Sequence, residues 1–185
     1  NIEDNALLMS LKLSKNTDRL FDFLTNQHIK DSLFLSLLKM YNWHNDGLLQ
    51  SDENRDICRF IVKRFYANKE RNHNIEYSPL GIYSTILDTT NSTLLDIIAG
   101  IKPLNDVKNM DTKSPEFLVL KAIAMHKNSK EETLLFLLSL GDLRLKKIIA
   151  QNTNISLFLA QKLYKDPSLH LALSLNEHLP IERSE

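Results

Sequence analysis

The chain has 185 residues, which is enough for one or two domains with a sizeable core. Its 23 Lys and Arg residues balance 23 Asp and Glu residues, whereas a domain that binds a polyanion usually carries a basic excess. One cysteine excludes a disulfide framework within the chain, and no stretch resembles a membrane span or a signal peptide, so we expect a cytoplasmic protein with no membrane partner.

The first hundred residues carry a faint helical repeat. Three apolar segments each open with Asp and close with Asn: 4–16, 31–42 and 56–68. Their closing asparagines are 26 residues apart, a step that is typical of two-helix solenoid units. Second helices are expected at 17–25 and 43–49, and a further unit is expected from Ser78, with its second helix over 92–100. An unrelated helical bundle remains the alternative for this part of the chain.

Two polar stretches interrupt the pattern. Residues 68–77 are aperiodic and predict a loop. Residues 101–113 contain Pro, Asp and Asn, and they divide divergent helical repeats at 1–100 from clearer repeats at 114–185. Solenoids accept insertions on one face, so we interpret 101–113 as an insertion in one continuous solenoid, with a domain linker as the alternative.

The last third contains three units that open at Ser114, Asp142 and Asp166. Each opening residue is a good N-cap, and proline follows it in the first and third units. First helices are expected to carry residues 122–124, 148–150 and 172–174. Each is expected to end at a repeated asparagine, 24 residues from the next: Asn128, Asn152 and Asn176.

Second helices follow these asparagines. Ser129 and Glu132 have the spacing of a capping box at the start of the first of them. Leucine-rich stretches at 134–140 and 157–163 supply the apolar faces, and Gly141 is placed to end the first as a C′ glycine.

These units resemble the leucine-rich variant repeat family, a HEAT-like group of bacterial α-solenoids. The family pattern is an Asp-rich opener, a helix ending in Ala-x-Asn, a Thr/Pro turn and a second Leu-rich helix. The matching residues are Asp142, Ala150, Asn152, Leu157, Leu163, Asp166, Pro167, Asn176, Leu179 and Pro180. The match covers about 70 of the 185 residues. It departs from the pattern at Leu143-Arg144, at Ser174 in place of alanine, and by two extra residues before Asn128.

The resemblance implies an all-α solenoid of HEAT-like helix pairs, with about 24–26 residues per unit, that acts as a non-catalytic scaffold for another protein. Some family members bind an iron–sulfur cluster through cysteines ahead of the repeats. Cys58 alone cannot supply four thiolates, so we expect no cofactor. It lies in an apolar segment, where a buried, inert thiol is the usual state.

The residues show no catalytic motif. The chain contains no phosphate-binding glycine loop and no Gly-x-Ser-x-Gly elbow. Its six histidines are scattered, and none forms an i, i+4 pair with a carboxylate in the zinc-protease arrangement, so we expect no metal site and no enzyme. His170 and His178 could approach each other, although a solvated role is the commoner one.

Two basic groups are candidate contact surfaces. Arg55, Arg59 and Lys63 recur at i, i+4 and i+8 and form a stripe opposite an apolar face. Arg144 and Lys147 make a smaller patch in a later unit. A solvated face is the commoner interpretation, and a nucleic-acid-binding HEAT-like module, related to DNA-alkylation-repair glycosylases, is the alternative by fold analogy. Tyr41 and Trp43 are either recognition aromatics or core residues.

The end of the chain stays apolar. Residues 168–175 alternate as a strand would, but the Asp-Pro opening favours a helix with Leu169, Ala172 and Leu173 inward. Leu171 and Leu175 are then left uncovered. We therefore expect the parent protein to continue, or this end to self-associate or to bind a partner. The first residue is not methionine, which also suggests a processed or excised piece.

Overall fold

The computed structural model describes residues 28–40, 52–67, 79–100 and 107–179, together with the isolated positions 6, 9 and 26. Within these ranges the chain is helical and contains no strand, which confirms the all-α prediction. The α-helices are α3 (Asp31–Met40), α4 (Asp52–Ala67), α5 (Pro79–Asp88), α6 (Ser92–Ala99), α7 (Pro115–Met125), α8 (Glu131–Ser139), α9 (Leu143–Ala150), α10 (Leu157–Tyr164) and α11 (His170–Ser174). Two short 3₁₀ helices are η3 (Val107–Asn109) and η4 (Pro167–Leu169).

Several expectations fall outside the described residues. These are the segments 4–16, 17–25, 43–49 and 68–77, with Tyr41 and Trp43. The predicted helices at 31–42, 56–68 and 92–100 correspond to α3, α4 and α6. None of the described helices is long and apolar enough to cross a membrane.

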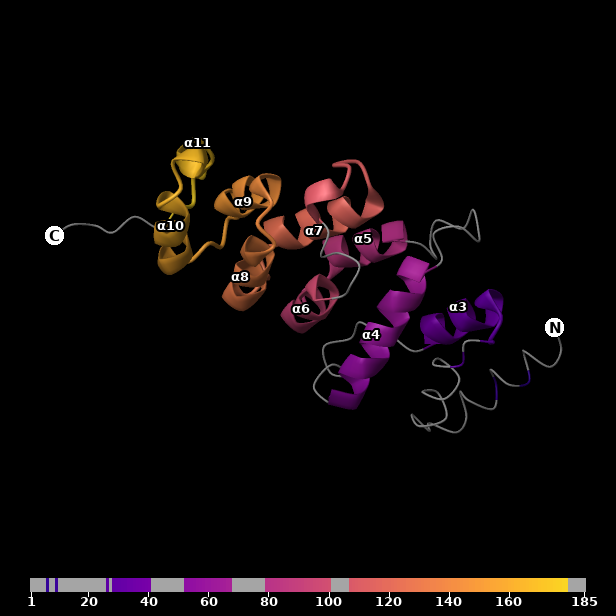
Figure 1. Cartoon of the computed structure of the whole chain (residues 1–185). Helices are drawn as coiled ribbons and strands as arrows, with labels where there is room; N and C mark the ends of the chain where they lie inside the picture. Colours follow the sequence, from indigo (N-terminus) through magenta and orange to yellow (C-terminus); the bar gives the residue numbers. More distant parts are fainter. Residues whose placement is uncertain are drawn as a thin grey trace.

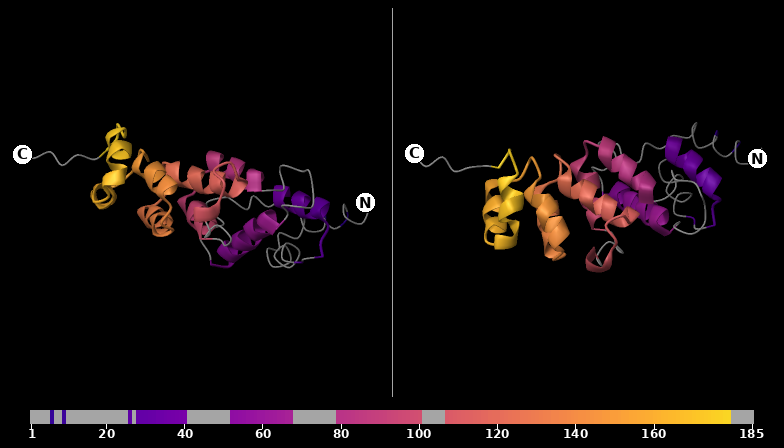
Figure 2. Two further views of the ribbon diagram at one scale, coloured as in Figure 1. Left: turned by 45° about the horizontal axis from the view of Figure 1, so that its top comes forward. Right: turned by 90° about the horizontal axis from the view of Figure 1, so that it is seen from above.

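The helices follow one another in chain order along the length of the molecule, from α3 to α11 (Figure 1). Helices two places apart in the chain pack against each other: α4 with α6, α5 with α7, α6 with α8, α7 with α9 and α9 with α11. As a result α5, α7, α9 and α11 form one row, and α4, α6 and α8 form a second row. Figure 2 shows the same progression from two further directions, with α10 and α11 at the end opposite α3.

The core runs between these rows. On α4 the apolar face predicted opposite the basic stripe is buried, at Ile57, Ile61 and Phe65. The Phe65 ring and the Phe34 ring of α3 pack edge to face, with centroids 6.4 Å apart. The Arg64 guanidinium lies over the Phe34 ring, 4.2 Å from its centroid. The α3–α4 junction is therefore held by aromatic and cation–π packing.

Local capping signals place the helix starts as the sequence predicts. Ser114, Asp142 and Asp166 each accept a hydrogen bond from a backbone N–H two or three residues on. Asn91 and Ser156 cap α6 and α10 in the same way. Such caps satisfy donors that the first turn of a helix leaves unpaired.

The end of α8 is also as predicted, but its start is not. Gly141 has φ of +72°, a backbone conformation that favours glycine after a helix. The expected capping box is wrong: the N-cap is Lys130, which makes no side-chain capping bond. The Ser129 hydroxyl instead donates to the Ile123 carbonyl at 2.6 Å, because this buried side chain faces the end of α7.

Two buried asparagines make the same contacts in successive units. Nδ2 of Asn152 donates to the carbonyls of Ala124 and His126, at 2.8 and 3.2 Å. Nδ2 of Asn176 donates to the carbonyls of Ala150 and Asn152, both at 2.9 Å. In each case Oδ1 accepts from the backbone N–H two residues on. Asn152 and Asn176 are therefore structurally equivalent.

Asn128, the third member of the predicted series, is not equivalent to them. His126 takes that place, because its Nδ1 accepts from the Asn128 backbone N–H at 3.1 Å and its carbonyl accepts from Asn152. Asn128 lies two residues further on and donates Nδ2 to the Thr90 carbonyl. The strict 24-residue step is thus wrong for the first unit, since the equivalent residues His126 and Asn152 are 26 residues apart. We call His126, Asn152 and Asn176 the polar ladder.

Candidate functional site

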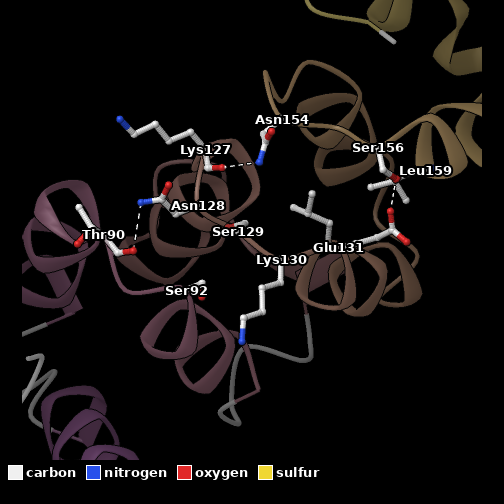
Figure 3. Close-up of a pocket in the computed structure, with 11 residues that line it drawn as sticks. Thr90, Ser92, Lys127, Asn128, Ser129, Lys130, Glu131, Asn154, Ser156 and Leu159 are labelled. Atoms are coloured by element: carbon white, nitrogen blue, oxygen red, sulfur yellow. Dashed lines mark hydrogen bonds between the residues drawn. The ribbon is translucent and has the colours of Figure 1, made fainter. Parts of the chain in front are cut away.

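A polar groove lies where the loops enter α6, α8 and α10 (Figure 3). Its volume is about 470 Å³. Its lining residues are Thr90, Ser92, Lys127, Asn128, Ser129, Lys130, Glu131, Leu134, Asn154, Ser156 and Leu159. We call it the loop groove. Sequence reasoning missed it, because its walls come from three loops that are far apart along the chain.

Several polar side chains of the loop groove already form hydrogen bonds with other groups of the chain. Nδ2 of Asn154 donates to the Lys127 carbonyl at 3.0 Å, and Asn128 donates to Thr90 in the same way (Figure 3). The Ser156 hydroxyl donates to the Glu131 carboxylate. No histidine or cysteine lines the groove, and the carboxylate beside Ser156 is that of Glu131.

The predicted basic stripe lies along α4, but two of its members are paired. Arg55 contacts Asp52 at 3.4 Å, and Arg59 contacts Asp56 at 2.6 Å. Both carboxylates are on the preceding turn of the same helix, and Lys63 is exposed. The two acids offset the positive charge of the stripe, which weakens it as a track for phosphates.

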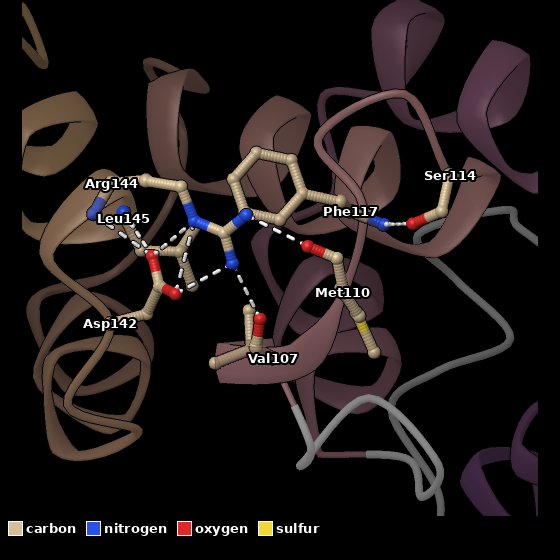
Figure 4. Close-up of polar contacts among 7 residues, drawn as sticks. All are labelled: Val107, Met110, Ser114, Phe117, Asp142, Arg144 and Leu145. Atoms are coloured by element: carbon tan, nitrogen blue, oxygen red, sulfur yellow. Dashed lines mark hydrogen bonds and ion pairs between the residues drawn. The ribbon is translucent and has the colours of Figure 1, made fainter.

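In the predicted Arg144–Lys147 patch, the arginine is engaged within the chain. The Arg144 guanidinium turns toward η3 and donates to the carbonyls of Val107 and Met110, at 2.6 and 2.8 Å (Figure 4). It also lies 4.5 Å from the centroid of the Phe117 ring. Lys147 is exposed on α9. Arg144 is therefore a clamp that holds the described part of segment 101–113 against α7 and α9.

Asp142 completes the Arg144 clamp. Its carboxylate accepts from the Arg144 guanidinium at 2.8 Å and from the backbone N–H groups of Arg144 and Leu145 (Figure 4). Burial raises the pKa of this carboxyl, but the Arg144 side chain and the two backbone donors outweigh burial and hold the pKa below its ordinary value. The same residue thus caps α9 and anchors the arginine.

The remaining candidates from the sequence are Cys58 and the two histidines His170 and His178. Cys58 is buried on α4, and burial raises the pKa of its thiol to about 12, so it stays a thiol at neutral pH. His170 stacks on Tyr164 and its Nε2 lies 2.8 Å from the Tyr164 carbonyl, while His178 is exposed. Within the described residues, no group of three His, Cys, Asp or Glu side chains could hold a metal ion.

The two C-terminal leucines lie as the helical interpretation predicts. Leu169, Ala172 and Leu173 are buried, and the strand alternative is wrong. Leu171 is 73% exposed and Leu175 is 62% exposed.

The polar ladder shows which residues of earlier helices occupy these two positions. Counting back from the ladder residue of each unit, Leu171 corresponds to Lys147 and Leu175 to Gln151. Both counterparts are also exposed. The leucines therefore lie on a lateral face that is open to solvent in an earlier unit, where the unit that follows does not cover it.

Phe158 repeats this pattern on α10, and sequence reasoning missed it. Counted from the N-cap positions of α8 and α10, Phe158 corresponds to Glu132, which is exposed. Phe158 is itself 56% exposed. A position-by-position comparison of the two second helices could have identified it.

Comparisons with protein-family models, with curated proteins and with solved structures gave no match. The resemblance to leucine-rich variant repeats therefore stays a prediction that depends on the residues quoted above.

Proposed function

We propose that this chain is a HEAT-like α-solenoid with leucine-rich variant-like units, and that it serves as a non-catalytic scaffold in the cytoplasm. We place its protein partner on the exposed face of α11, at Leu171 and Leu175. A second copy of the chain is one possible partner of this surface.

The helix rows support the solenoid. Three successive first helices, α7, α9 and α11, pack side by side and end in the three residues of the polar ladder. Each ladder amide reaches back to the end of the preceding first helix. In a solenoid fold, the repeat units stack along one direction and each unit contacts only its neighbours.

The exposed leucines carry the functional proposal. Lys147 and Gln151 show that the unit folds with polar side chains at these two positions. Packing within the chain therefore does not require leucine at either position. Moving one leucine side chain from water into a contact contributes roughly 1.5–3 kcal/mol, so the pair, one turn apart, can anchor a partner.

The arginines that suggested a nucleic-acid contact surface have partners within the chain, and this favours a scaffold function. Arg144 and Asp142 clamp the insertion, and Arg55 and Arg59 pair with acids of their own helix. The nucleic-acid alternative has less support, because it needs free cations and the chain has no net charge.

The test exchanges the two leucines for their counterparts in the preceding unit. A Leu171→Lys, Leu175→Gln variant should keep the far-UV spectrum and melting temperature of the wild type. It should lose, by at least about tenfold, both the capture of a protein partner and any self-association seen by sedimentation velocity.

Met125→Gln is the matched control. Met125 occupies the Leu175 position on α7 and is also exposed. This variant removes an exposed apolar side chain from the equivalent position of α7, outside α11, so it should bind as the wild type does. If the double variant at 171 and 175 keeps full binding, or loses no more than the control, the α11 surface is the wrong one.

A further inference from the structure

His126 is the first residue of the polar ladder and bridges two elements. It follows the last residue of α7, and its backbone N–H donates to the Ile123 carbonyl at 3.1 Å. Its Nδ1 accepts from the Asn128 N–H at 3.1 Å, where Asn152 and Asn176 use an amide oxygen. An accepting Nδ1 carries no proton, so the neutral ring carries its proton on Nε2.

The end of α5 contributes to the electrostatics of the ring, because the backbone carbonyls of Thr89 and Ile86 favour its protonated form. Nδ1 of His126 holds the Asn128 N–H in the α7–α8 turn, as the Asn152 amide oxygen holds the Asn154 N–H in the α9–α10 turn. Unlike an amide, an imidazole titrates near neutral pH.

We propose that His126 makes the α7–α8 turn a pH-sensitive joint, and that mild acid opens this turn and reshapes the loop groove. A second proton must bind to Nδ1, where it would face the Asn128 N–H. Two donors then oppose each other and the hydrogen bond at this turn is lost. The turn carries five residues of the groove wall, at 127–131. This inference goes beyond the proposed scaffold function and does not depend on it.

The groups around His126 determine the direction in which its pKa is shifted. Burial is the main cause that lowers the pKa of His126, and the nearby charge of Lys127 lowers it further, while the Thr89 and Ile86 carbonyls raise it. The groups that meet the residue from α5 and α9 are uncharged carbonyls and the Asn152 amide. The exposed Asp88 lies beside Thr89 in the chain.

A lowered folded-state pKa means that the neutral ring stabilises the fold. Its contribution is full above the ordinary histidine pKa, and it is lost as the pH falls through the lowered folded-state value.

The test compares the wild type with His126→Asn, which supplies the ladder residue of the later units and cannot titrate. Amide hydrogen exchange is measured from pH 7.5 to pH 5 and expressed as protection, which removes the intrinsic effect of pH. In the wild type, protection of the Asn128 amide should fall by roughly fivefold, the factor expected for one net hydrogen bond. In His126→Asn it should stay constant. Equal pH dependence in both proteins would overturn the proposal.

A second measurement needs no variant. In the wild type, the NMR signals of the His126 ring and the Asn128 amide should titrate together, with one midpoint below the ordinary histidine value. If the ring titrates while the Asn128 amide signal stays fixed, the joint does not exist.

Discussion

Replacing Asn152 with Ala tests the polar ladder at its most buried member. The side chain is 1% exposed and makes three hydrogen bonds, two through Nδ2 and one through Oδ1. The change therefore leaves the Ala124 and His126 carbonyls without their side-chain donor and opens the turn at Asn154.

The magnitude follows from these three bonds. A net contribution of about 1 kcal/mol per hydrogen bond gives a loss of about 3 kcal/mol. For a chain of this size each kcal/mol lowers the melting temperature by roughly 2–4 °C, so a decrease of roughly 6–12 °C is expected. The measurement is a thermal melt followed by circular dichroism, with urea unfolding as a second determination of the free energy of unfolding.

Asn128→Ala is the control, because the 24-residue spacing of the sequence would make Asn128 equivalent to Asn152. In the structure its side chain makes a single bond, to the Thr90 carbonyl, in exposed surroundings. Its loss should cost less than about 1 kcal/mol. If Asn128→Ala destabilises the protein as much as Asn152→Ala, the ladder assignment is refuted.

Three other variants and reactions test further parts of the structure. Arg144→Ala should lower the melting temperature and speed hydrogen exchange over 107–110, because the clamp on this insertion is lost; unchanged exchange there would contradict the clamp. Cys58 should react with a maleimide only at the rate of unfolding at pH 7–8, since its thiol is buried and protonated, and rapid labelling of the folded protein would show otherwise. Joint alanine substitution of Arg55, Arg59 and Lys63 should leave binding to DNA and RNA weak and unchanged at physiological salt. A steep, salt-dependent loss of submicromolar affinity in that variant would favour a nucleic-acid function.

The starts of α7 and α9 and the end of α8 could be predicted from the sequence because their signals are local. A cap such as Ser114 and the glycine at 141 act within one turn of the backbone, so residues a few positions apart determine the outcome. The burial of Leu173 and the exposure of Leu171 also follow from periodicity within one helix.

Contacts between distant segments could not be predicted in this way. Asn128 and Asn152 resemble each other in sequence, but the ladder place belongs to the side chain that accepts from the backbone N–H two residues on, and His126 does so. Arg144 has the sequence pattern of a surface cation. Its partners are the carbonyls of Val107 and Met110, 37 and 34 residues earlier, in a polar stretch that interrupts the repeat pattern of the sequence.

The central claim, that successive helix pairs are interchangeable units in the register of the polar ladder, can be tested by deleting one unit. Removing residues 126–151 joins Met125 to Asn152, so that Asn152 takes the place of His126 and α10 takes the place of α8. Removing residues 128–151 follows the asparagine spacing of the sequence instead and shifts α10 by two residues. Both chains lack Arg144, so the loss of its clamp is the same in each.

Chemical denaturation of the two shortened chains is the most direct measurement. We expect the chain lacking 126–151 to stay helical and to unfold cooperatively, because neighbouring units contribute stability in register. We expect the chain lacking 128–151 to lose its cooperative transition. Equal stability of the two chains, or greater stability of the second, would contradict the repeat register.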